Sequence, residues 1–167
     1  VSDCLKKDQE ILVQVEKDER GNKGAALTTN ISLAGRYLVL MPNNPKAAGI
    51  SRRLEGKERD KLKERIASLN VPESMGLIVR TAGEGKDLED LKWDLEYLQR
   101  VWEGISEANT LKKSPILIFK ESDIIIRALR DYLKEDIEEI WVDTEEAYEE
   151  ASEFVERVMP DQTMLLN

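Results

Sequence analysis

One short stretch combines the residue types that bind an oxyanion. An apolar run at residues 77–79 leads into Arg80 and Thr81, and glycines follow at positions 83 and 85. A buried strand that ends in this way brings a guanidinium, a hydroxyl and backbone N–H groups to one edge of a sheet. Such a set suits a phosphate. The ordinary alternative is a solvated arginine before a glycine turn, and a motif this short does not decide between the two.

The glycines of this stretch do not form a Walker loop. That motif needs a glycine five residues before its Gly-Lys pair and a serine or threonine after it. Arg80 and Asp87 occupy those positions here. If the stretch binds a phosphate, it therefore does so in another way.

The rare residue types limit the chemistry of the chain. Cys4 is the single cysteine and histidine is absent, which excludes an internal disulfide and leaves no ordinary zinc ligand set. Histidine-based acid–base catalysis is absent as well, and no cluster of carboxylates, lysines or tyrosines stands out in its place. We expect no catalytic residue, metal site or cofactor within this chain.

Charge is distributed unevenly. The chain has a net charge of −9, but residues 1–81 hold 15 basic and 11 acidic residues, whereas residues 82–167 hold 10 and 23. Between Arg20 and Arg53 no acidic residue occurs. This asymmetry favours an anionic partner at the N-terminal half, with a solvated basic loop as the alternative. No run is typical of a membrane span or a secretory signal, so a cytoplasmic protein is expected.

The elements that would position Arg80 follow from hydrophobic periodicity and turn residues. The predicted helices cover 58–69, 87–108, 122 or 123 to 133, and 143–158, the last capped by Asp143 with Glu146 closing a capping box. The predicted strands cover 11–15, 25–31, 37–41, 77–79, 115–119 and 137–142. The first two form a hairpin that needs further strands. The pattern indicates a mixed α/β, or α+β, fold with an all-β tail at its front.

Three of the predicted helices carry specific expectations. Trp93 and Tyr97 lie off the main apolar stripe of the 87–108 helix, which favours core packing or a domain contact over base stacking. The helix ending near residue 133 should bury Ile124, Ile125, Ala128, Leu129 and Tyr132. The acidic outer face of the last helix is interpreted as solvated.

Four ordered motifs carry a family resemblance that covers nearly the whole chain. They are VQVEKDERGNKGAALTT at 13–29, SLAGRYLVLMPN at 32–43, GISRR at 49–53 and GLIVRTAGEG at 76–85, with weaker matches at 93–95, 127–133 and 142–143. In these motifs the chain resembles a central piece of the bacterial ribonuclease E/G family. Since it begins with Val1 in what reads as mid-domain sequence, an excised fragment is expected.

The resemblance implies a domain organisation. Residues 1–30 would be the C-terminal strands of an OB-type RNA-binding barrel, residues 31–125 a 5′ sensor, and residues 126–167 part of an RNase H-like subdomain. The family cleaves single-stranded RNA with magnesium held by a downstream nuclease domain, and zinc links its subunits further downstream. Both metals are therefore expected outside this sequence, and the full-length protein is expected to be a homo-oligomer.

The resemblance also implies recognition residues. Arg80 and Thr81 would hold the 5′-monophosphate of the RNA, with Gly35 and Val39 shaping the pocket. Arg52 or Arg53 would lie near it. In the barrel, Lys17 and Lys23 would contact the RNA backbone.

Two other functions remain open from the sequence. The acidic C-terminal half could make the chain a structural module that docks on the missing nuclease domain. Alternatively, the Arg80 stretch could bind a small phosphometabolite on an α/β fold, although no complete nucleotide-binding fingerprint is present.

Overall fold

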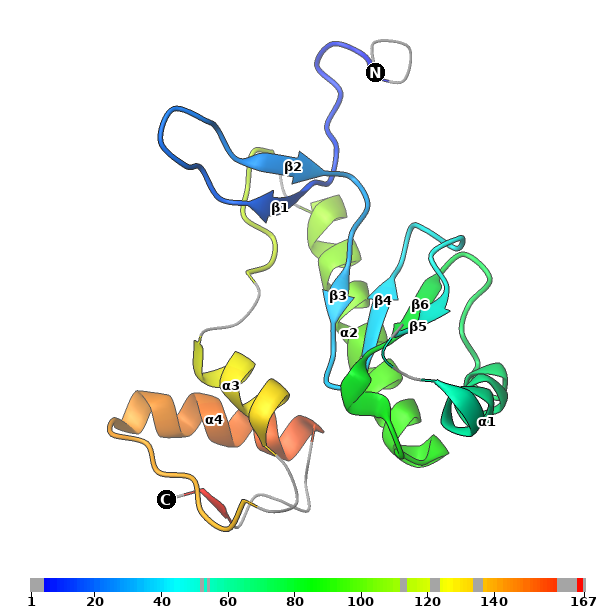
Figure 1. Ribbon diagram of the computed structural model, residues 1–167. Coiled ribbons are helices and arrows are strands. Elements are labelled where there is room, and N and C mark those ends of the chain that lie inside the picture. Colours follow the sequence, from blue (N-terminus) through cyan, green and yellow to red (C-terminus); the bar gives the residue numbers. More distant parts are fainter. Residues whose placement is uncertain are drawn as a thin grey trace.

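The computed structural model describes residues 5–51, 53, 55–111, 114–120, 124–133, 137–158 and 165–166. These residues combine helices with two sheets, so the mixed α+β class is confirmed (Figure 1). The elements are β1 Gln14–Lys17, β2 Ala26–Thr28, β3 Leu33–Ala34, β4 Leu38–Met41, β5 Gly49–Ile50, α1 Gly56–Ala67, β6 Gly76–Val79, the 3-10 turn η1 Thr81–Gly83, α2 Leu88–Leu111, α3 Ile124–Tyr132 and α4 Glu145–Val158.

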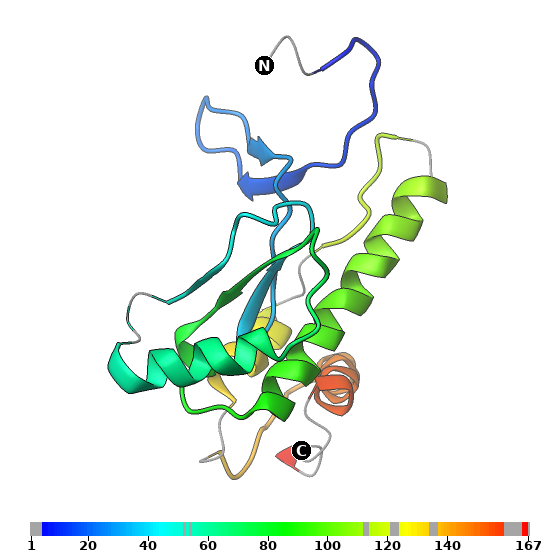
Figure 2. The same cartoon turned by 90° about the vertical axis from the view of Figure 1, so that its right-hand side faces the viewer.

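A four-stranded sheet in the order β3-β4-β6-β5 forms the centre of the molecule. β4 pairs antiparallel with both β3 and β6, and Leu38 lies opposite Val79. β5 runs parallel to β6, since the chain returns through α1 between them. Figure 2 shows α2 lying along one face of this sheet, with α1 crossing near its edge.

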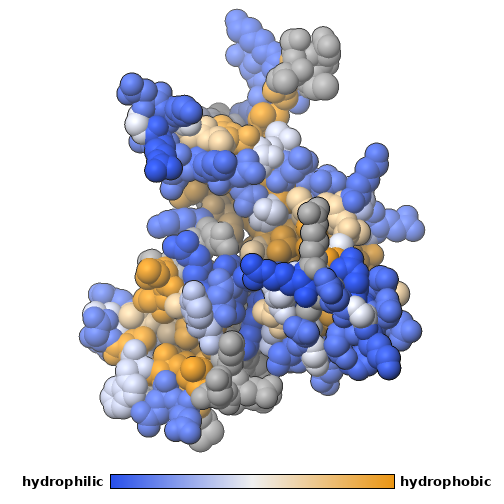
Figure 3. Space-filling model, viewed as in Figure 1, coloured by the Kyte–Doolittle hydropathy of each residue, from blue (hydrophilic) through white to orange (hydrophobic). Residues whose placement is uncertain are grey.

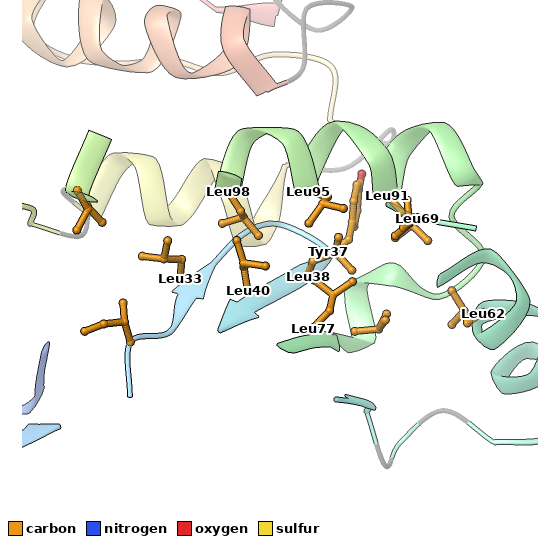
Figure 4. Packing of buried hydrophobic residues seen from close by; sticks show 13 residues of the cluster. Leu33, Tyr37, Leu38, Leu40, Leu62, Leu69, Leu77, Leu91, Leu95 and Leu98 are labelled. Atoms are coloured by element: carbon orange, nitrogen blue, oxygen red, sulfur yellow. The ribbon is translucent and has the colours of Figure 1, made fainter. Parts of the chain in front are cut away.

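Alternation along the strands places the main core between the sheet and α2. Leucines of β3, β4 and β6 point toward leucines of α2, as Figure 4 shows. Leu38, Leu40 and Val79 are fully buried, whereas their strand neighbours Val39 and Ile78 are half-buried on the opposite face. Each buried leucine or valine stabilises the fold by about 1.5–3 kcal/mol.

A second, smaller core lies between α3 and α4. Its buried members include Ile126, Leu129, Phe154 and Val155. The ring of Tyr97 on α2 meets the ring of Phe154 on α4 edge to face, at 6.5 Å between centroids. The predicted contact role of Tyr97 is thus confirmed, but Trp93 is 44% exposed and does not share it.

The β1–β2 hairpin is attached to the sheet through side-chain amides. Gln14 exchanges two hydrogen bonds with the backbone of Ser32, at 2.8 and 3.0 Å. Asn43, just after β4, accepts from Ile31 N and donates to Thr29 O. The hairpin therefore lies at the C-terminal end of β4, opposite to the end where Leu38 begins the strand.

Two predicted strands are wrong. Residues 115–119 form no strand, and Leu117 is 74% exposed, because this apolar run borders a cavity beside α2 rather than pairing with a described strand. Residues 137–142 provide only a single bridge, from Ile140 to Leu166, and Trp141 is 75% exposed. Apolar composition alone does not supply a pairing partner.

Two details of the helices also differ from prediction. On α3 the buried stripe contains Ile126 and Leu129, whereas Ile124 and Tyr132 are 70% and 75% exposed. The cap of α4 is Thr144, whose Oγ1 accepts from Ala147 N at 3.2 Å, one residue later than the predicted Asp143. The other helix and strand predictions hold with shifted ends, and the predicted cap of α3 at Ser122 or Asp123 lies outside the described residues. The predicted domain boundaries after residues 30 and 125 stay predictions.

Candidate functional site

Arg80 lies where β6 ends beside the start of β4. Its N–H donates to Tyr37 O at 2.8 Å, which continues the pairing of the two strands by one residue. Because side chains alternate along a strand, Arg80 shares the face of Ile78 and Val39, away from α2. The predicted site residues Arg80 and Val39 therefore lie on one face of the sheet, where Val39 is half-buried.

The guanidinium of Arg80 is held by two acceptors. NH1 donates to Gly35 O at 2.5 Å, and NH2 donates to Asp131 Oδ1 at 2.9 Å. The side chain of Arg80 remains 29% exposed. Two of the predicted site residues, Arg80 and Gly35, are thus in direct contact, and α3 contributes a carboxylate that the sequence did not suggest.

Arg130 supports this carboxylate from the other side. Its Nε and NH2 donate to the two carboxylate oxygens of Asp131 at 3.2 and 3.3 Å, and its NH1 donates to Ala34 O at 3.1 Å. Partial burial alone would raise the pKa of Asp131, but the hydrogen bonds and charges of Arg130 and Arg80 outweigh burial and lower that pKa below its ordinary value. Asp131 is therefore a carboxylate at neutral pH.

Asp94 on α2 fixes the turn that carries Gly35. Its carboxylate accepts from the backbone N–H groups of Arg36, Tyr37 and Leu38 at 2.8 to 2.9 Å. Asp94 is only 3% exposed, and burial raises its pKa, while the three N–H donors oppose that shift. The turn therefore has a fixed path between β3 and β4, and the carbonyl of Gly35 points at Arg80.

Gly35 itself must be a glycine for this contact to exist. An ideal Cβ at Gly35 would lie 2.4 Å from Asp94 Oδ1, far inside a normal contact distance. Beside it, Arg36 is buried and its guanidinium donates to Leu133 O at the end of α3. The turn is thus enclosed between α2 and α3.

Thr81 begins η1, directly after Arg80. Its side chain is exposed on the same end of the sheet. Gly83 closes the turn by donating to Arg80 O at 3.1 Å, and an added Cβ there would come within 2.9 Å of Val79. Close packing of Gly83 therefore constrains the path of η1, on which Thr81 lies.

Of the adjacent arginines at positions 52 and 53, the structure describes one. Arg52 lies outside the described residues. Arg53 follows Ser51, whose N–H donates to Val79 O at 2.9 Å, so Arg53 lies beyond Arg80 at the same end of the sheet. Arg53 is exposed, and no contact joins it to Arg80 within the described part of the chain.

Lys17 and Lys23 lie on the hairpin, apart from this site. Lys17 ends β1, and Lys23 forms a backbone bridge with Arg20 in the loop. All three cations are exposed, but the same hairpin carries Glu16, Asp18 and Glu19, all exposed. The hairpin is therefore close to neutral overall.

A cavity of about 610 Å³ lies between the hairpin, β3, α2 and the 114–120 segment. Its walls are mainly apolar, with Ile11, Leu12, Leu98 and Ile118 among them. Arg80 and Thr81 do not line it. Ala34 and Arg130 do line it, so the cavity adjoins the Arg80 site without including Arg80 itself.

Comparison with known proteins identifies the family of this chain. A family model described as Ribonuclease E/G family matches residues 32–167. The chain belongs to the ribonuclease E/G family. It is 58% identical over 161 residues to Ribonuclease E of Haemophilus influenzae, a match that covers 96% of the chain and 17% of that protein.

Two further relatives of the ribonuclease E/G family match the chain over most of its length. Ribonuclease E of Escherichia coli is 57% identical over 155 residues, covering 93% of the chain and 15% of that protein. Ribonuclease G of Escherichia coli is 37% identical over 167 residues, covering 99% of the chain and 34% of that protein. The chain thus spans a minor part of the length of these relatives.

Neither a metal site nor a membrane-spanning helix is found where the structure is described. In those residues no three cysteine or acidic side chains are placed to hold a metal ion. None of the described helices is both long and apolar enough to cross a bilayer. The magnesium and zinc of the ribonuclease E/G family were expected outside this sequence, and that expectation stays a prediction.

Sequence reasoning missed the residues that brace Arg80. Asp94 interrupts the leucine stripe of α2 between Leu91 and Leu95, and an acid at a buried helical position was the available signal. Asp131 and Arg130 lie within a motif that resembles the ribonuclease E/G family but had no assigned role. Arg80 and Ala34, which Asp131 and Arg130 contact, lie 51 and 96 residues away in the sequence, so no local pattern could reveal these contacts.

Proposed function

We propose that this chain is the part of a ribonuclease E/G protein that binds single-stranded RNA and recognises a 5′-monophosphate. The main support is the Arg80 guanidinium, partly exposed and anchored on Gly35 O at the end of a rigid sheet. A guanidinium forms short, charge-assisted hydrogen bonds with phosphate oxygens. The neighbouring Thr81 hydroxyl is exposed to donate a further one.

The surroundings of Arg80 suit the end of an RNA strand. Arg80, Arg130 and Asp131 together carry a net charge of +1, which attracts a terminal phosphate more strongly than an internal diester of lower charge. Ala34, Val39 and Ile78 provide half-buried apolar surface on the same face, where a ribose or base could pack. Lys17 and Lys23 on the hairpin would contact the backbone further along the strand.

Fluorescence anisotropy tests this function directly. The full-length protein is titrated, without magnesium so that cleavage is suppressed, into one short RNA carrying either a 5′-monophosphate or a 5′-hydroxyl. We expect tighter binding of the monophosphate, and we expect Arg80→Ala to remove about tenfold or more of that preference, the size of a lost hydrogen bond to a charged group. Equal affinities of the unmodified protein for the two RNAs would reject the proposal.

Two controls separate the phosphate site from general charge. Arg100→Ala removes a similar exposed charge from α2 and should leave the preference unchanged. Lys17→Ala and Lys23→Ala should weaken the binding of both RNAs equally. They should also reduce the salt dependence of binding, because contacts to the RNA backbone release counterions. A change in preference on the lysine substitutions would place phosphate recognition on the hairpin instead.

A docking role is a second candidate, favoured by exposed apolar surface on the α3–α4 unit. An open hollow of about 310 Å³ there is lined by Leu129, Tyr132, Leu133 and Trp141 among others, and Figure 3 shows apolar surface gathered in this region. Large exposed apolar patches mark interaction sites. Tight association with the remainder of the protein, together with no measurable RNA affinity, would support docking over RNA recognition.

A further inference from the structure

Arg80 and Asp131 join two separate parts of the fold. Arg80 ends β6 of the central sheet, and Asp131 lies on α3, whose core is shared with α4. Their contact at 2.9 Å connects residues 51 positions apart. The Arg80 site is therefore assembled from both parts, and its geometry depends on how α3 sits on the sheet.

The two acceptors of Arg80 fix the plane of its guanidinium. An arginine side chain loses about 2 kcal/mol of rotamer entropy when it is held in one place. Gly35 O and Asp131 Oδ1 impose that order before any ligand arrives. Among the described residues they use two of the five guanidinium N–H groups, and the others can face an incoming phosphate.

Arg130 offsets the negative charge of Asp131, which would otherwise repel a phosphate. It binds both carboxylate oxygens and is itself anchored on Ala34 O. The carboxylate is thus shared between two guanidinium groups. Its position is set by β3 through Arg130, so that it forms a rigid support for Arg80.

We infer that Asp131 is a positioning residue for phosphate recognition, holding Arg80 in the orientation that discriminates a 5′-monophosphate from a 5′-hydroxyl. This inference rests on the proposed function. It adds that discrimination requires α3 to be docked on the sheet. Displacement of α3 would release Arg80 and remove the preference while the hairpin still bound RNA.

The test compares three substitutions in the full-length protein, using the same monophosphate and hydroxyl RNAs without magnesium. Asp131→Ala removes the acceptor and should reduce the affinity ratio about tenfold. Asp131→Asn keeps an oxygen for Arg80 and should hold the ratio within about threefold of the unmodified protein. Glu149→Gln, at an exposed acid on α4, should leave the ratio unchanged.

A further variant confirms that Asp131 acts through Arg80. In the Arg80→Ala protein, adding Asp131→Ala should not lower the ratio again, since the residue being positioned is gone. If Asp131→Ala does not fold, Asp131→Leu replaces it, because leucine keeps the volume without offering an acceptor. Circular dichroism of each variant checks that the fold is retained.

Four results would overturn the inference. Higher monophosphate affinity in both Asp131→Ala and Asp131→Asn would show that the carboxylate competes with the ligand. An equal loss of affinity for both RNAs in Asp131→Ala would show that Asp131 has a general structural role. An unchanged ratio in Asp131→Ala, with discrimination intact in the unmodified protein, would reject the positioning role alone, whereas no discrimination in the unmodified protein would reject the proposed function and the inference with it.

Discussion

Gly35 lies against the carboxylate of Asp94 so closely that a side chain at Gly35 has no room. An added Cβ would fall 2.4 and 2.6 Å from the two carboxylate oxygens. Those oxygens are in turn committed to three backbone N–H groups of the following residues. The glycine and the buried acid thus depend on each other, and the carbonyl that anchors Arg80 depends on both.

The first prediction is that Gly35→Ala destabilises the fold. The alanine methyl must push Asp94 away from its donors, which leaves buried polar groups unpaired at a cost of about 2–4 kcal/mol. Urea denaturation measures the free energy of unfolding. Gly104→Ala on α2 is the matched control, because nothing lies within 4 Å of its added Cβ, and an exposed helical glycine gains about 1 kcal/mol on this change.

The second prediction concerns the acid. Asp94→Asn keeps the shape of the side chain but turns an NH₂ group toward at least one backbone N–H, so a donor faces a donor. We expect a loss of about 2–4 kcal/mol in the free energy of unfolding. Glu96→Gln, an exposed position on the same helix, should change it by less than about 0.5 kcal/mol. Equal stability of Asp94→Asn and the unmodified protein would contradict the role of Asp94 in fixing the turn at residues 35–38.

The third prediction concerns the contact between the two cores. Phe154→Ala removes a buried ring that packs on Tyr97 and should cost about 3–5 kcal/mol. Hydrogen exchange should rise first at α3 and α4, because β4 and β6 keep their own core with α2. Tyr148→Ala, at a half-exposed ring on α4, is the control and should change exchange little. A uniform rise over the whole chain would show one cooperative unit instead.

The fourth prediction is a pH dependence that belongs to Asp131. Its pKa is lowered in the folded protein relative to an ordinary value of about 3.9 in the unfolded chain. Its stabilising effect is therefore complete above that ordinary value and is lost as the pH falls through the lower, folded-state pKa. The difference in unfolding free energy between the unmodified protein and Asp131→Asn should be constant above about pH 5 and shrink below about pH 4.

Subtracting the two proteins isolates this effect. Asp94 contributes with the opposite sign, because its pKa is raised in the folded state, but it is present in both proteins and cancels. Guanidinium chloride denaturation at a series of pH values gives the difference. A difference that stays constant down to pH 2.5 would show that Arg80 and Arg130 do not stabilise the ionised carboxylate.

Local patterns predicted the elements around the site but not the contacts that complete it. The strand ending at Val79 and the helix beginning near Leu88 follow from apolar runs and periodicity, and so does the placement of Arg80 at a sheet edge. The contacts of Asp94 with the turn and of Asp131 with Arg80 join residues 51 to 58 positions apart, and no spacing rule connects them. Only the folded arrangement shows which acids reach which donors.

The failed strand at 115–119 has a related cause. Its apolar residues match a buried strand, but in the described structure they border a cavity beside α2 and the hairpin. Burial of such a run requires a second surface, and periodicity within the run says nothing about that surface. The predicted OB-type, 5′ sensor and RNase H-like assignments stay predictions.

The hydrogen bonds between Asp94 and the turn at residues 35–38 can form only late in the synthesis of this region. The turn at residues 35–38 leaves the ribosome well before its acid, which follows 56 to 58 residues later. Since chains emerge from the N-terminus at about 5–20 residues per second, those backbone N–H groups wait several seconds in water before α2 arrives. Arg80 is thus translated before Asp94, which fixes the turn that supports it, and the arrangement around Arg80 is complete only after α2 and α3 have been made.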